Sequence, residues 1–408
     1  MSVSYTNCLP MVMNEMHSSH KKRLLFVNGH LNVGGVEKSL VDLLRHLDYT
    51  KYDVDLLLLR GMGDYFDQLP KELNVILCDT SAIDGNVITA VMYCILQGKL
   101  RLAWLKIIIF LSSVFGRWML LLARPSLPIS CSYDYAIAFR HDVCADFVAY
   151  IVNSNKRFCW WHFGEWNVKA TKEVALTKLW NKMDCIVAVS EGCLNMIENR
   201  LPMLKTPVRV IPNMVDIRAV EQLSRVLKPN LDSKRGVTLM TITRLYVEKH
   251  VEDVPHAAAL LLRNGISNFS WYIVGEGDKF EEVRLAIDYY GVQQHVFMLG
   301  NKVNPYPYML AADIFVHPSR VESQCLSVLE AMSLRKPCIV CRSIGPSSYI
   351  HSGENGLLVD TDANSIAKAI VSLIKGVDTT QMGEKAYQTV VGQFTPEIVM
   401  NKFYSLIN

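Results

Sequence analysis

Residues 318–340 read PSRVESQCLSVLEAMSLRKPCIV: a Pro-Ser-Arg turn, an apolar stretch and a strand-like run. Glu322 and Glu330 stand eight residues apart around the apolar stretch. On one unbroken helix they would lie about 80° apart and roughly 12 Å along the axis, so they would not share a face. We therefore expect Glu322 in the loop and a helix that begins near Leu326, which places Glu330 one turn inside the helix. Both carboxylates could then contact one elongated ligand.

Short apolar runs alternate with helix-length segments on both sides of this stretch. The first half contains LLFVN, VDLLLL, YAIAF, RFCWW, CIVAVS and VRVIP, and the second half contains VTLMTI, SWYIVG, HVFMLG, DIFVHP and PCIVC. This alternation indicates parallel sheets covered by helices on both faces. The sequence therefore predicts an α/β protein of two doubly wound, Rossmann-like domains, with a ligand cleft between them at the strand C-termini.

A polar, turn-rich stretch from Pro212 to Arg235 separates the two series of runs. We expect a polar tail over residues 1–22, a first domain over 23–212, a second domain over 213–386, and a C-terminal helix over 387–408 that returns toward the first domain. The last segment, PEIVMNKFYSLIN, is amphipathic and suits such a closing helix.

The composition excludes some classes of protein. The 42 basic and 39 acidic residues are too evenly balanced for a nucleic-acid binder unless the charge is segregated. Eleven scattered cysteines, and a start without the pattern of a signal peptide, favour a cytoplasmic location. Cys338 and Cys341 are three apart in a predicted strand, where they point to opposite faces, so we expect no metal site there.

Two loops carry candidate anion-binding residues. Gly34 and Gly35 precede a predicted helix, where glycines let backbone N–H groups approach a phosphate, although many such turns need glycine for steric reasons alone. Arg244 and Lys249 follow the first strand of the second half. A guanidinium and an ammonium at a strand C-terminus suit a diphosphate, and a solvated surface loop is the alternative.

These elements together resemble a known family. In order and spacing, TRL…EK, VGEGD, VFMLG, ADIFVHPSRVESQCLSVLEAM and SGENGLLV are similar to the donor-binding half of the retaining glycosyltransferases of family 4, which have the GT-B fold. The first half adds GGVEKSL, WWHFG, AVSEG and IPNMVD. The resemblance spans nearly the whole chain. It departs from the family at Thr243 and Cys325, where glycine is frequent, and at Ser347, where an acid is frequent.

The resemblance implies roles for individual residues. Glu322 lies against the donor sugar, Glu330 binds the nucleotide ribose, and Arg244 and Lys249 hold the diphosphate. Histidine in WWHFG, His162, faces the donor sugar from the acceptor domain. The resemblance implies two catalytic residues, His162 and Glu322. It implies that the donor is bound by Gly34, Gly35, Arg244, Lys249, Cys325, Leu326 and Glu330.

The implied function is the transfer of a sugar from a nucleoside diphosphate sugar to a hydroxyl of a glycan or lipid-linked glycan. UDP is the first nucleotide expected. The implied process is bacterial surface polysaccharide synthesis. No cofactor is expected, because a GT-B enzyme does not need a metal to stabilise the leaving group. Two alternatives remain open at this point: a nucleotide-sugar epimerase on the same fold, and a catalytically silent glycan-binding scaffold.

The stretch GKLRLAWLKIIIFLSSVFGRWMLLLARP carries a basic stripe if it forms one continuous helix. Lys99, Lys106, Arg117 and Arg124 then fall within about 20° of one another. With Trp104, Trp118 and many aliphatic residues, the pattern suits a helix that lies on the inner face of the cell membrane without crossing it. A domain helix whose polar edge meets water is the alternative.

Overall fold

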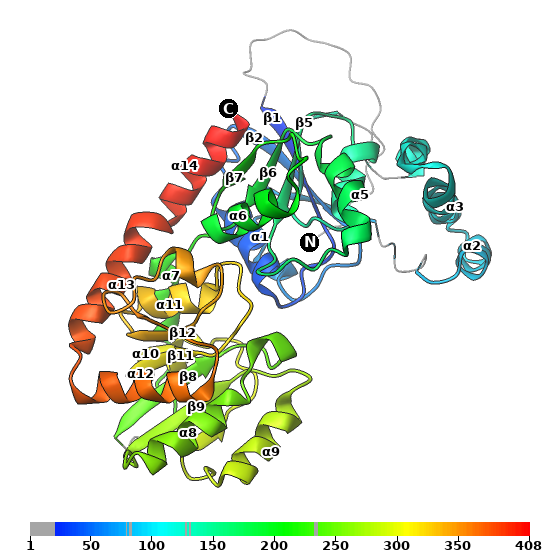
Figure 1. Cartoon of the computed structure of the whole chain (residues 1–408). Coiled ribbons are helices and arrows are strands. Elements are labelled where there is room, and N and C mark those ends of the chain that lie inside the picture. The colour runs from blue at the N-terminus through cyan, green and yellow to red at the C-terminus, as the bar shows by residue number, and fades with distance from the viewer. Residues whose placement is uncertain (1–20, 79, 81–83, 127–128, 130–131, 232–235) are drawn as a thin grey trace.

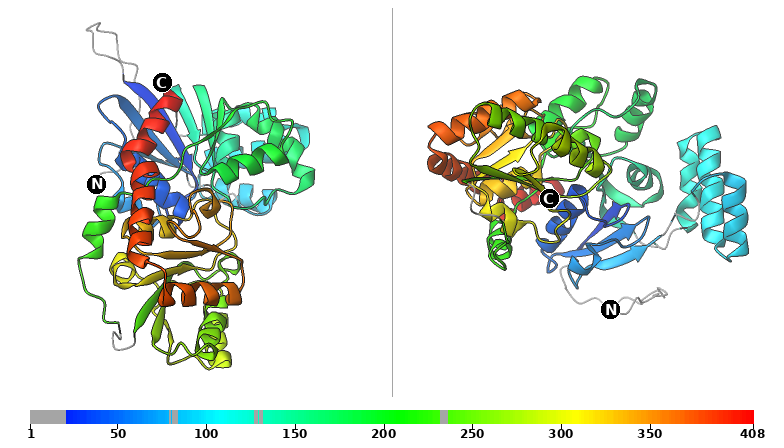
Figure 2. Two further views of the ribbon diagram at one scale, coloured as in Figure 1. Left: turned by 60° about the vertical axis from the view of Figure 1, so that its left-hand side comes forward. Right: turned by 90° about the horizontal axis from the view of Figure 1, so that it is seen from below.

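The computed structural model of the chain describes residues 21–78, 80, 84–126, 129, 132–231 and 236–408 (Figure 1). These residues form two parallel sheets with strand orders β3-β2-β1-β4-β5-β6-β7 and β10-β9-β8-β11-β12-β13. Helices cover the sheets, and the two sheets belong to separate lobes of the molecule (Figures 1 and 2). The predicted α/β fold of two Rossmann-like domains is confirmed.

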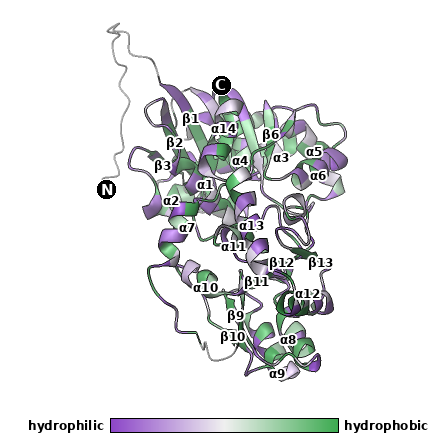
Figure 3. Cartoon of the chain, turned by 90° about the vertical axis from the view of Figure 1, so that its left-hand side faces the viewer, coloured by the Kyte–Doolittle hydropathy of each residue, from purple (hydrophilic) through white to green (hydrophobic). Residues whose placement is uncertain are grey.

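The strands are short and mostly buried, since helices cover both faces of each sheet. The first sheet contains β1 (Lys22–Asn28), β2 (Tyr52–Leu58), β3 (Asn74–Leu77), β4 (Tyr133–Ala138), β5 (Ser154–Trp161), β6 (Cys185–Ala188) and β7 (Val208–Val210). The second contains β8 (Val237–Ile242), β9 (Phe269–Val274), β10 (Val296–Met298), β11 (Ile314–His317), β12 (Cys338–Cys341) and β13 (Leu357–Val359). In Figure 3 hydrophobic and hydrophilic colours alternate along the helices, as expected for helices with one buried face.

The helices follow the strands in alternation. Those of the first domain are α1 (Gly35–Arg45), α2 (Val87–Leu96), α3 (Leu100–Phe115), α4 (Val143–Asp146), α5 (Ala170–Trp180) and α6 (Glu191–Arg200). The first domain also has the 3-10 helices η1 (Phe66–Gln68) and η3 (Arg117–Ser126) and the π-helix η4 (Phe147–Ile151). After these come α7 (Ile217–Ser224), α8 (Asp253–Arg263), α9 (Phe280–Tyr290), α10 (Tyr306–Ala311), α11 (Leu326–Ser333), α12 (Ala363–Lys375), α13 (Thr379–Gln393) and α14 (Pro396–Ile407), with η5 (Val247–Lys249) and η6 (Pro346–Ser348).

The strand order reverses at the middle of each sheet. In the first domain β1 pairs with both β2 and β4, and in the second β8 pairs with both β9 and β11. Ligands of doubly wound proteins bind beyond the carboxyl ends of the strands at such a switch point. The loops after β1, β4, β8 and β11 are therefore the first places to look for a site.

The C-terminal segment returns to the first domain. The stretch 387–408, for which we expected one helix, contains the end of α13 and all of α14, because the chain turns between Gln393 and Pro396. Phe403 of α14 stacks on Phe26 of β1 with ring centroids 6.2 Å apart, and Tyr404 stacks on Tyr52. Burial of these aromatic rings attaches the end of the chain to the first sheet.

The expected continuous helix over residues 99–124 is wrong. Helix α3 ends at Phe115, and Gly116 has a φ of 109°, a conformation that glycine adopts readily and that breaks the helix. Residues 117–126 form a separate 3-10 helix, η3. The four basic residues therefore do not line one face of a single helix, and the predicted basic stripe does not exist. Together α2, α3 and η3 form a group of helices beside the first domain (Figures 1 and 2), which we call the helical projection, residues 87–126.

Candidate active site

The quoted stretch has the local structure that its sequence predicts. Glu322 lies in the loop after β11, and α11 begins at Leu326, with Glu330 one turn inside it. Cys325 precedes the helix with a φ of 69°, in the left-handed region where glycine costs least. The backbone thus explains why glycine is frequent at this position in the resembling family.

Glu322 is the centre of a buried charged cluster. Its Oε1 accepts a hydrogen bond from Lys249 Nζ at 2.7 Å and lies 2.8 Å from His317 Nε2. Only 12% of the Glu322 side chain and 12% of the Lys249 side chain are exposed. Lys249 ends η5 after β8, and His317 ends β11, so the two neighbouring strands at the switch point bring both partners to the loop.

The charges of this cluster follow from its contacts. Burial would raise the pKa of the Glu322 carboxyl, but the Lys249 ammonium and the His317 imidazole outweigh burial and hold this pKa at about 2. Burial lowers the pKa of His317, and the contacts with Cys325 and Glu322 more than reverse this effect and raise it to about 9. At neutral pH the cluster therefore holds one carboxylate between two cations.

Glu330 is buried at the boundary between the domains. Its Oε1 accepts a hydrogen bond from the Tyr306 hydroxyl at 2.9 Å and lies 3.3 Å from Lys38 Nζ of the first domain. Lys38 also donates to Asp42 at 2.9 Å. Burial opposes the charged ammonium, but Glu330, Tyr306 and Asp42 together outweigh it and raise the pKa of Lys38 well above its ordinary value. A charged pair thus spans the two domains.

The domains also meet at the Glu322 loop. A Cβ added to Gly164 would lie 2.3 Å from the Glu322 carbonyl carbon, and one added to Gly192 would lie 2.3 Å from the Ile344 carbonyl oxygen. Cys193 Sγ lies 3.6 Å from the Ser323 carbonyl oxygen. Glycine is needed at both positions, because the backbones approach too closely for a side chain.

His162 stands two residues before Gly164, directly after β5. Burial is the main cause that lowers its pKa, to about 3, so the imidazole is neutral at pH 7. Its Nε2 is buried and has no hydrogen-bond partner within the part of the chain that the structure describes. The unsatisfied nitrogen lies in the loop that contacts the Glu322 loop, which is compatible with the predicted role beside the donor sugar.

The two glycines at the start of α1 have different surroundings. Gly34 is extended with a φ of −175°, and a Cβ there would lie 2.3 Å from Glu37 Oε2. Glu37 is buried and pairs with Arg140 at 2.9 Å. The Glu37 carboxylate thus occupies the space beside Gly34 at this helix end. Nothing lies within 4 Å of a Cβ added at Gly35. A phosphate at this turn stays a prediction.

The two predicted diphosphate ligands also differ. Lys249 contacts Glu322 as described, while Arg244 is exposed and its guanidinium lies 5.1 Å from the centroid of the Tyr246 ring. The structure therefore brings Lys249, but not the Arg244 guanidinium, into direct contact with the glutamate. The assignment of both cations to a diphosphate stays a prediction.

Sequence reasoning missed three residues of the site. His317 had a signal, because it ends a strand just before the Pro-Ser-Arg turn. Lys38 follows Glu37 within GGVEKSL and could have been noticed as a cation in the first turn after the glycine pair. Tyr306 carried no local signal, because its contact with Glu330 depends on how α10 packs beside α11.

The two cysteines of CIVC lie in the second sheet. Cys338 and Cys341 are buried free thiols in β12, near the carbonyl oxygens of Lys336 and Asp360 respectively. Among the described residues, the group of side chains with the composition and spacing to hold a metal ion is His317, Glu322 and Cys325.

Two models of known protein families match the chain, one in each domain. A family model described as Glycosyltransferase Family 4 matches residues 33–219, and one described as Glycosyl transferases group 1 matches residues 226–389. LpsE of Rhizobium meliloti, a lipopolysaccharide core biosynthesis glycosyltransferase, is 30% identical over 230 residues, 55% of this chain and 64% of that protein.

A second relative is the UDP-Gal:alpha-D-GlcNAc-diphosphoundecaprenol alpha-1,3-galactosyltransferase of Escherichia coli, 27% identical over 46% of this chain and 50% of that protein. The matched regions thus span between half and two thirds of these relatives. HepE of Anabaena, solved in complex with UDP, superposes with a TM-score of 0.68 over 94% of this chain and 99% of that one. At 16% identity this likeness shows the GT-B fold alone. With both domains matched in order, the chain belongs to glycosyltransferase family 4.

Proposed function

We propose that the protein transfers a sugar, with retention of anomeric configuration, from a nucleoside diphosphate sugar to a hydroxyl of a glycan acceptor. The observation that carries the proposal is the buried Lys249–Glu322–His317 cluster at the switch point of the second sheet, with Glu330 one turn inside the adjoining helix. UDP is the first candidate nucleotide, and the name of the Escherichia coli relative, which includes UDP-Gal, supports it. The name of the lipopolysaccharide relative supports a glycan acceptor.

The arrangement suits the chemistry of this reaction. The bond between the anomeric carbon and the diphosphate oxygen breaks, and a bond to the acceptor oxygen forms on the same face of the sugar. The acceptor proton leaves on the departing diphosphate. Negative charge grows on the leaving oxygen, where Lys249 and Arg244 stabilise it, and positive charge grows on the sugar ring, where the Glu322 carboxylate stabilises it. Glu330 accepts hydrogen bonds from the ribose hydroxyls.

His162 has a matching role in this scheme. A neutral imidazole orients a sugar hydroxyl by hydrogen bonding and adds no positive charge beside the developing oxocarbenium-like sugar. The low pKa of His162, caused mainly by burial, keeps the ring in this form.

Ligand-induced stabilisation tests the proposal first. UDP, GDP and ADP and their glucose, galactose and N-acetylglucosamine derivatives are screened by thermal unfolding, because a ligand that binds only the folded state raises its apparent stability. We expect one nucleotide family to raise Tm and the matching sugar donor to give a product whose anomeric configuration, by NMR, equals that of the donor. An inverted product, or isomerised donor formed without any acceptor, contradicts the proposal.

We further propose that the helical projection attaches the enzyme to an anionic membrane surface, where a lipid-linked acceptor would be presented. Residues 87–126 contain five basic residues and no acidic residue. Large apolar side chains of this region are exposed, among them Leu96 (78%), Phe115 (64%) and Trp118 (59%). Basic charge beside exposed aromatic and aliphatic groups is complementary to an anionic bilayer interface.

Within the described residues, the helices lack the combination of length and hydropathy that spanning a bilayer requires. The proposed contact is therefore with the membrane surface. Flotation with anionic and neutral liposomes tests it: we expect the protein to float with anionic vesicles and to remain below with neutral ones. Equal flotation with both, or with neither, contradicts the proposal.

A further inference from the structure

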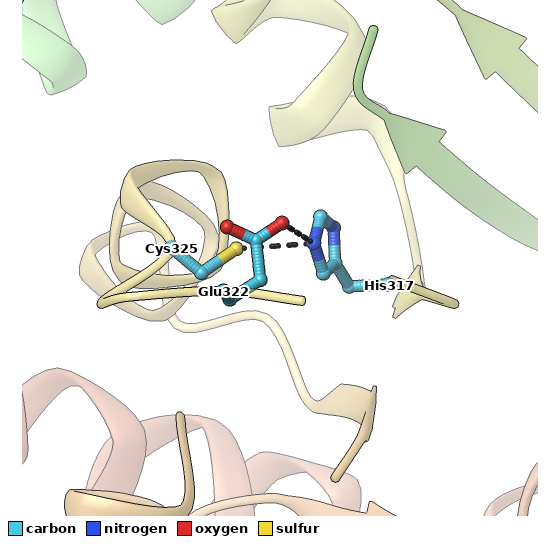
Figure 4. A group of neighbouring side chains, drawn as sticks. All are labelled: His317, Glu322 and Cys325. Atoms are coloured by element: carbon cyan, nitrogen blue, oxygen red, sulfur yellow. Dashed lines mark hydrogen bonds and ion pairs between the residues drawn. The ribbon is translucent and has the colours of Figure 1, made fainter. Parts of the chain in front are cut away.

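Three potential metal ligands converge in the β11–α11 turn. His317 ends β11, Glu322 lies in the loop and Cys325 immediately precedes α11 (Figure 4). His317 Nε2 lies 2.8 Å from Glu322 Oε1 and 3.2 Å from Cys325 Sγ. One ligand atom from each residue lies within 4.8 Å of the others. The three side chains are well shielded from solvent, with exposed fractions of 1% for His317 and 12% for Glu322 and 6% for the Cys325 residue.

Hydrogen bonding leaves the short contact between His317 and Cys325 unexplained. The Glu322 carboxylate only accepts, so the single hydrogen on His317 Nε2 is directed to it. The same nitrogen then has no lone pair for the Cys325 thiol, although Sγ lies within contact distance. The thiol also forms a hydrogen bond with Ser327 Oγ at 3.5 Å, an ordinary distance for sulfur. An ion that accepts electron pairs from nitrogen, oxygen and sulfur would satisfy the three groups together.

The ligand chemistry selects the ion. Imidazole nitrogen and cysteine sulfur favour Zn²⁺ and similar first-row metals, whereas Mg²⁺ and Ca²⁺ prefer oxygen alone. From the usual Zn–N, Zn–O and Zn–S distances, ligand atoms around a tetrahedral Zn²⁺ stand about 3.3–3.6 Å apart. The measured separations of 2.8 and 3.2 Å need to open by only a few tenths of an ångström.

We propose that His317, Glu322 and Cys325 form a binding site for Zn²⁺ with three protein ligands. The ion displaces the proton between His317 and Glu322 and the thiol proton of Cys325, both of which are released to solvent. It also competes with the Lys249 ammonium, whose Nζ lies 2.7 Å from the same carboxylate oxygen. Both effects make the site weaker than a structural zinc site with four protein ligands. A bound ion therefore inhibits sugar transfer, a consequence that rests on the proposed function, whereas metal binding itself does not.

Cobalt binding tests the site without any substrate. The full chain is treated with chelator, desalted and titrated with Co²⁺, which gives a near-ultraviolet charge-transfer band only when a thiolate is a ligand. We expect one Co²⁺ per chain, the band in the wild type, and displacement by Zn²⁺. The Cys325→Gly variant suits the left-handed backbone at this position and should lose the band and bind Zn²⁺ at least about tenfold more weakly in competition with a chromophoric chelator.

Cys341→Ala is the matched control, because it removes another buried thiol of the same domain and should keep the band. His317→Gln provides a second variant should Cys325→Gly fail to fold, and it should weaken Zn²⁺ binding to a similar degree. The absence of a thiolate band in the wild type, or undiminished Zn²⁺ affinity in the folded variants, overturns the proposal.

The inhibitory consequence is measured separately. We expect Zn²⁺ to inhibit sugar transfer by the wild type reversibly, with recovery on adding chelator, and to inhibit Cys325→Gly only at concentrations at least about tenfold higher. If Zn²⁺ binds through Cys325 while transfer is unaffected, the metal site stands and the placement of Glu322 against the donor sugar is wrong. If no sugar donor is used at all, the proposed function fails and the cobalt titration still decides the metal site.

Discussion

The boundary between the two domains, where the ligand cleft is predicted, and the helical projection carry charge in opposite ways. In the cleft, Lys249 and His317 flank Glu322, and Lys38 lies beside Glu330, so buried charges are paired at fixed distances. In the projection, basic residues occur without any acidic residue, among exposed apolar side chains, although Arg117 pairs with an acid, Asp146, outside the projection. Paired, shielded charges suit a compact ligand that must be held in one geometry. Unbalanced charge on an apolar surface suits a broad anionic surface with no fixed geometry.

This difference predicts that changes in one region leave the other function intact. Lys249→Ala should have the largest effect, because an ammonium that stabilises the leaving diphosphate acts mainly in the transition state. We expect kcat to fall about 10²–10³-fold while donor KM changes less. Lys368→Ala, an exposed lysine on α12, is the control. Undiminished turnover in folded Lys249→Ala would show that this residue has no role in the reaction. Altered vesicle binding by the same variant would show that the two regions do not act independently.

Reversal of charge in the projection should weaken membrane binding and leave turnover intact. Lys99→Glu with Arg101→Glu changes two exposed basic residues at the start of α3. At about 1 kcal/mol for each basic residue near an anionic surface, the double reversal should weaken vesicle binding by roughly 2–4 kcal/mol. Nucleotide affinity should not change. Lys368→Glu with Lys385→Glu, on the exposed faces of α12 and α13, is the charge-matched control.

Other basic residues of the projection are unsuitable for this experiment, because they contact the protein itself. Arg117 pairs with Asp146, Arg124 Nε donates to the Ile151 carbonyl oxygen at 3.0 Å, and Lys106 Nζ donates to the Gly85 carbonyl oxygen at 2.8 Å. Their reversal would disturb packing as well as charge. Undiminished vesicle binding by the Lys99 and Arg101 double variant in low salt would show that the projection is an ordinary packed element and not a membrane contact.

Gly164→Ala should disturb the cleft without a change in charge. The added Cβ would lie 2.3 Å from the Glu322 carbonyl carbon, so one of the two loops must move. Overpacking of this kind costs about 1–3 kcal/mol, and we expect lower thermal stability together with a loss of turnover. Gly392→Ala, in α13 with nothing within 4 Å of the new Cβ, should keep both. Wild-type turnover in Gly164→Ala would show that this contact does not position Glu322.

The smallest expected effect concerns His162 and pH. Burial lowers its folded-state pKa from 6.5 to about 3, so the unfolded chain binds the proton more tightly. The stability contribution of the neutral ring is complete above about pH 6.5 and is lost as the pH falls toward 3. Between these values His162→Gln should reduce the pH dependence of the unfolding free energy by up to about 1.4 kcal/mol per pH unit. Urea unfolding followed by tryptophan fluorescence at several pH values measures this slope. An unchanged slope would mean that His162 is not buried in its neutral form.

The sequence predicted the residues whose positions depend on sheet topology. Glu322, Lys249 and Glu330 lie where the order of strands and loops places them, since parallel strands bring their carboxyl ends to one edge. The contacts of Lys38 and Tyr306 with Glu330 could not be predicted, because they depend on how two domains and two helices pack. The basic stripe over 99–124 was wrong for a local reason: one glycine, Gly116, ends α3, and helical periodicity gives no information beyond the end of a helix.

Calorimetry with Glu330→Gln tests the central claim most directly, namely that the cleft binds a nucleoside diphosphate through this carboxylate. The substitution keeps the shape of the side chain and removes its charge, which should weaken its hydrogen bonds to the ribose by about 1–2 kcal/mol. The free nucleoside diphosphate selected by thermal unfolding is titrated into the wild type, Glu330→Gln and the exposed control Glu281→Gln on α9. We predict roughly five- to thirtyfold weaker binding for Glu330→Gln alone. Equal affinity for all three proteins would contradict the account.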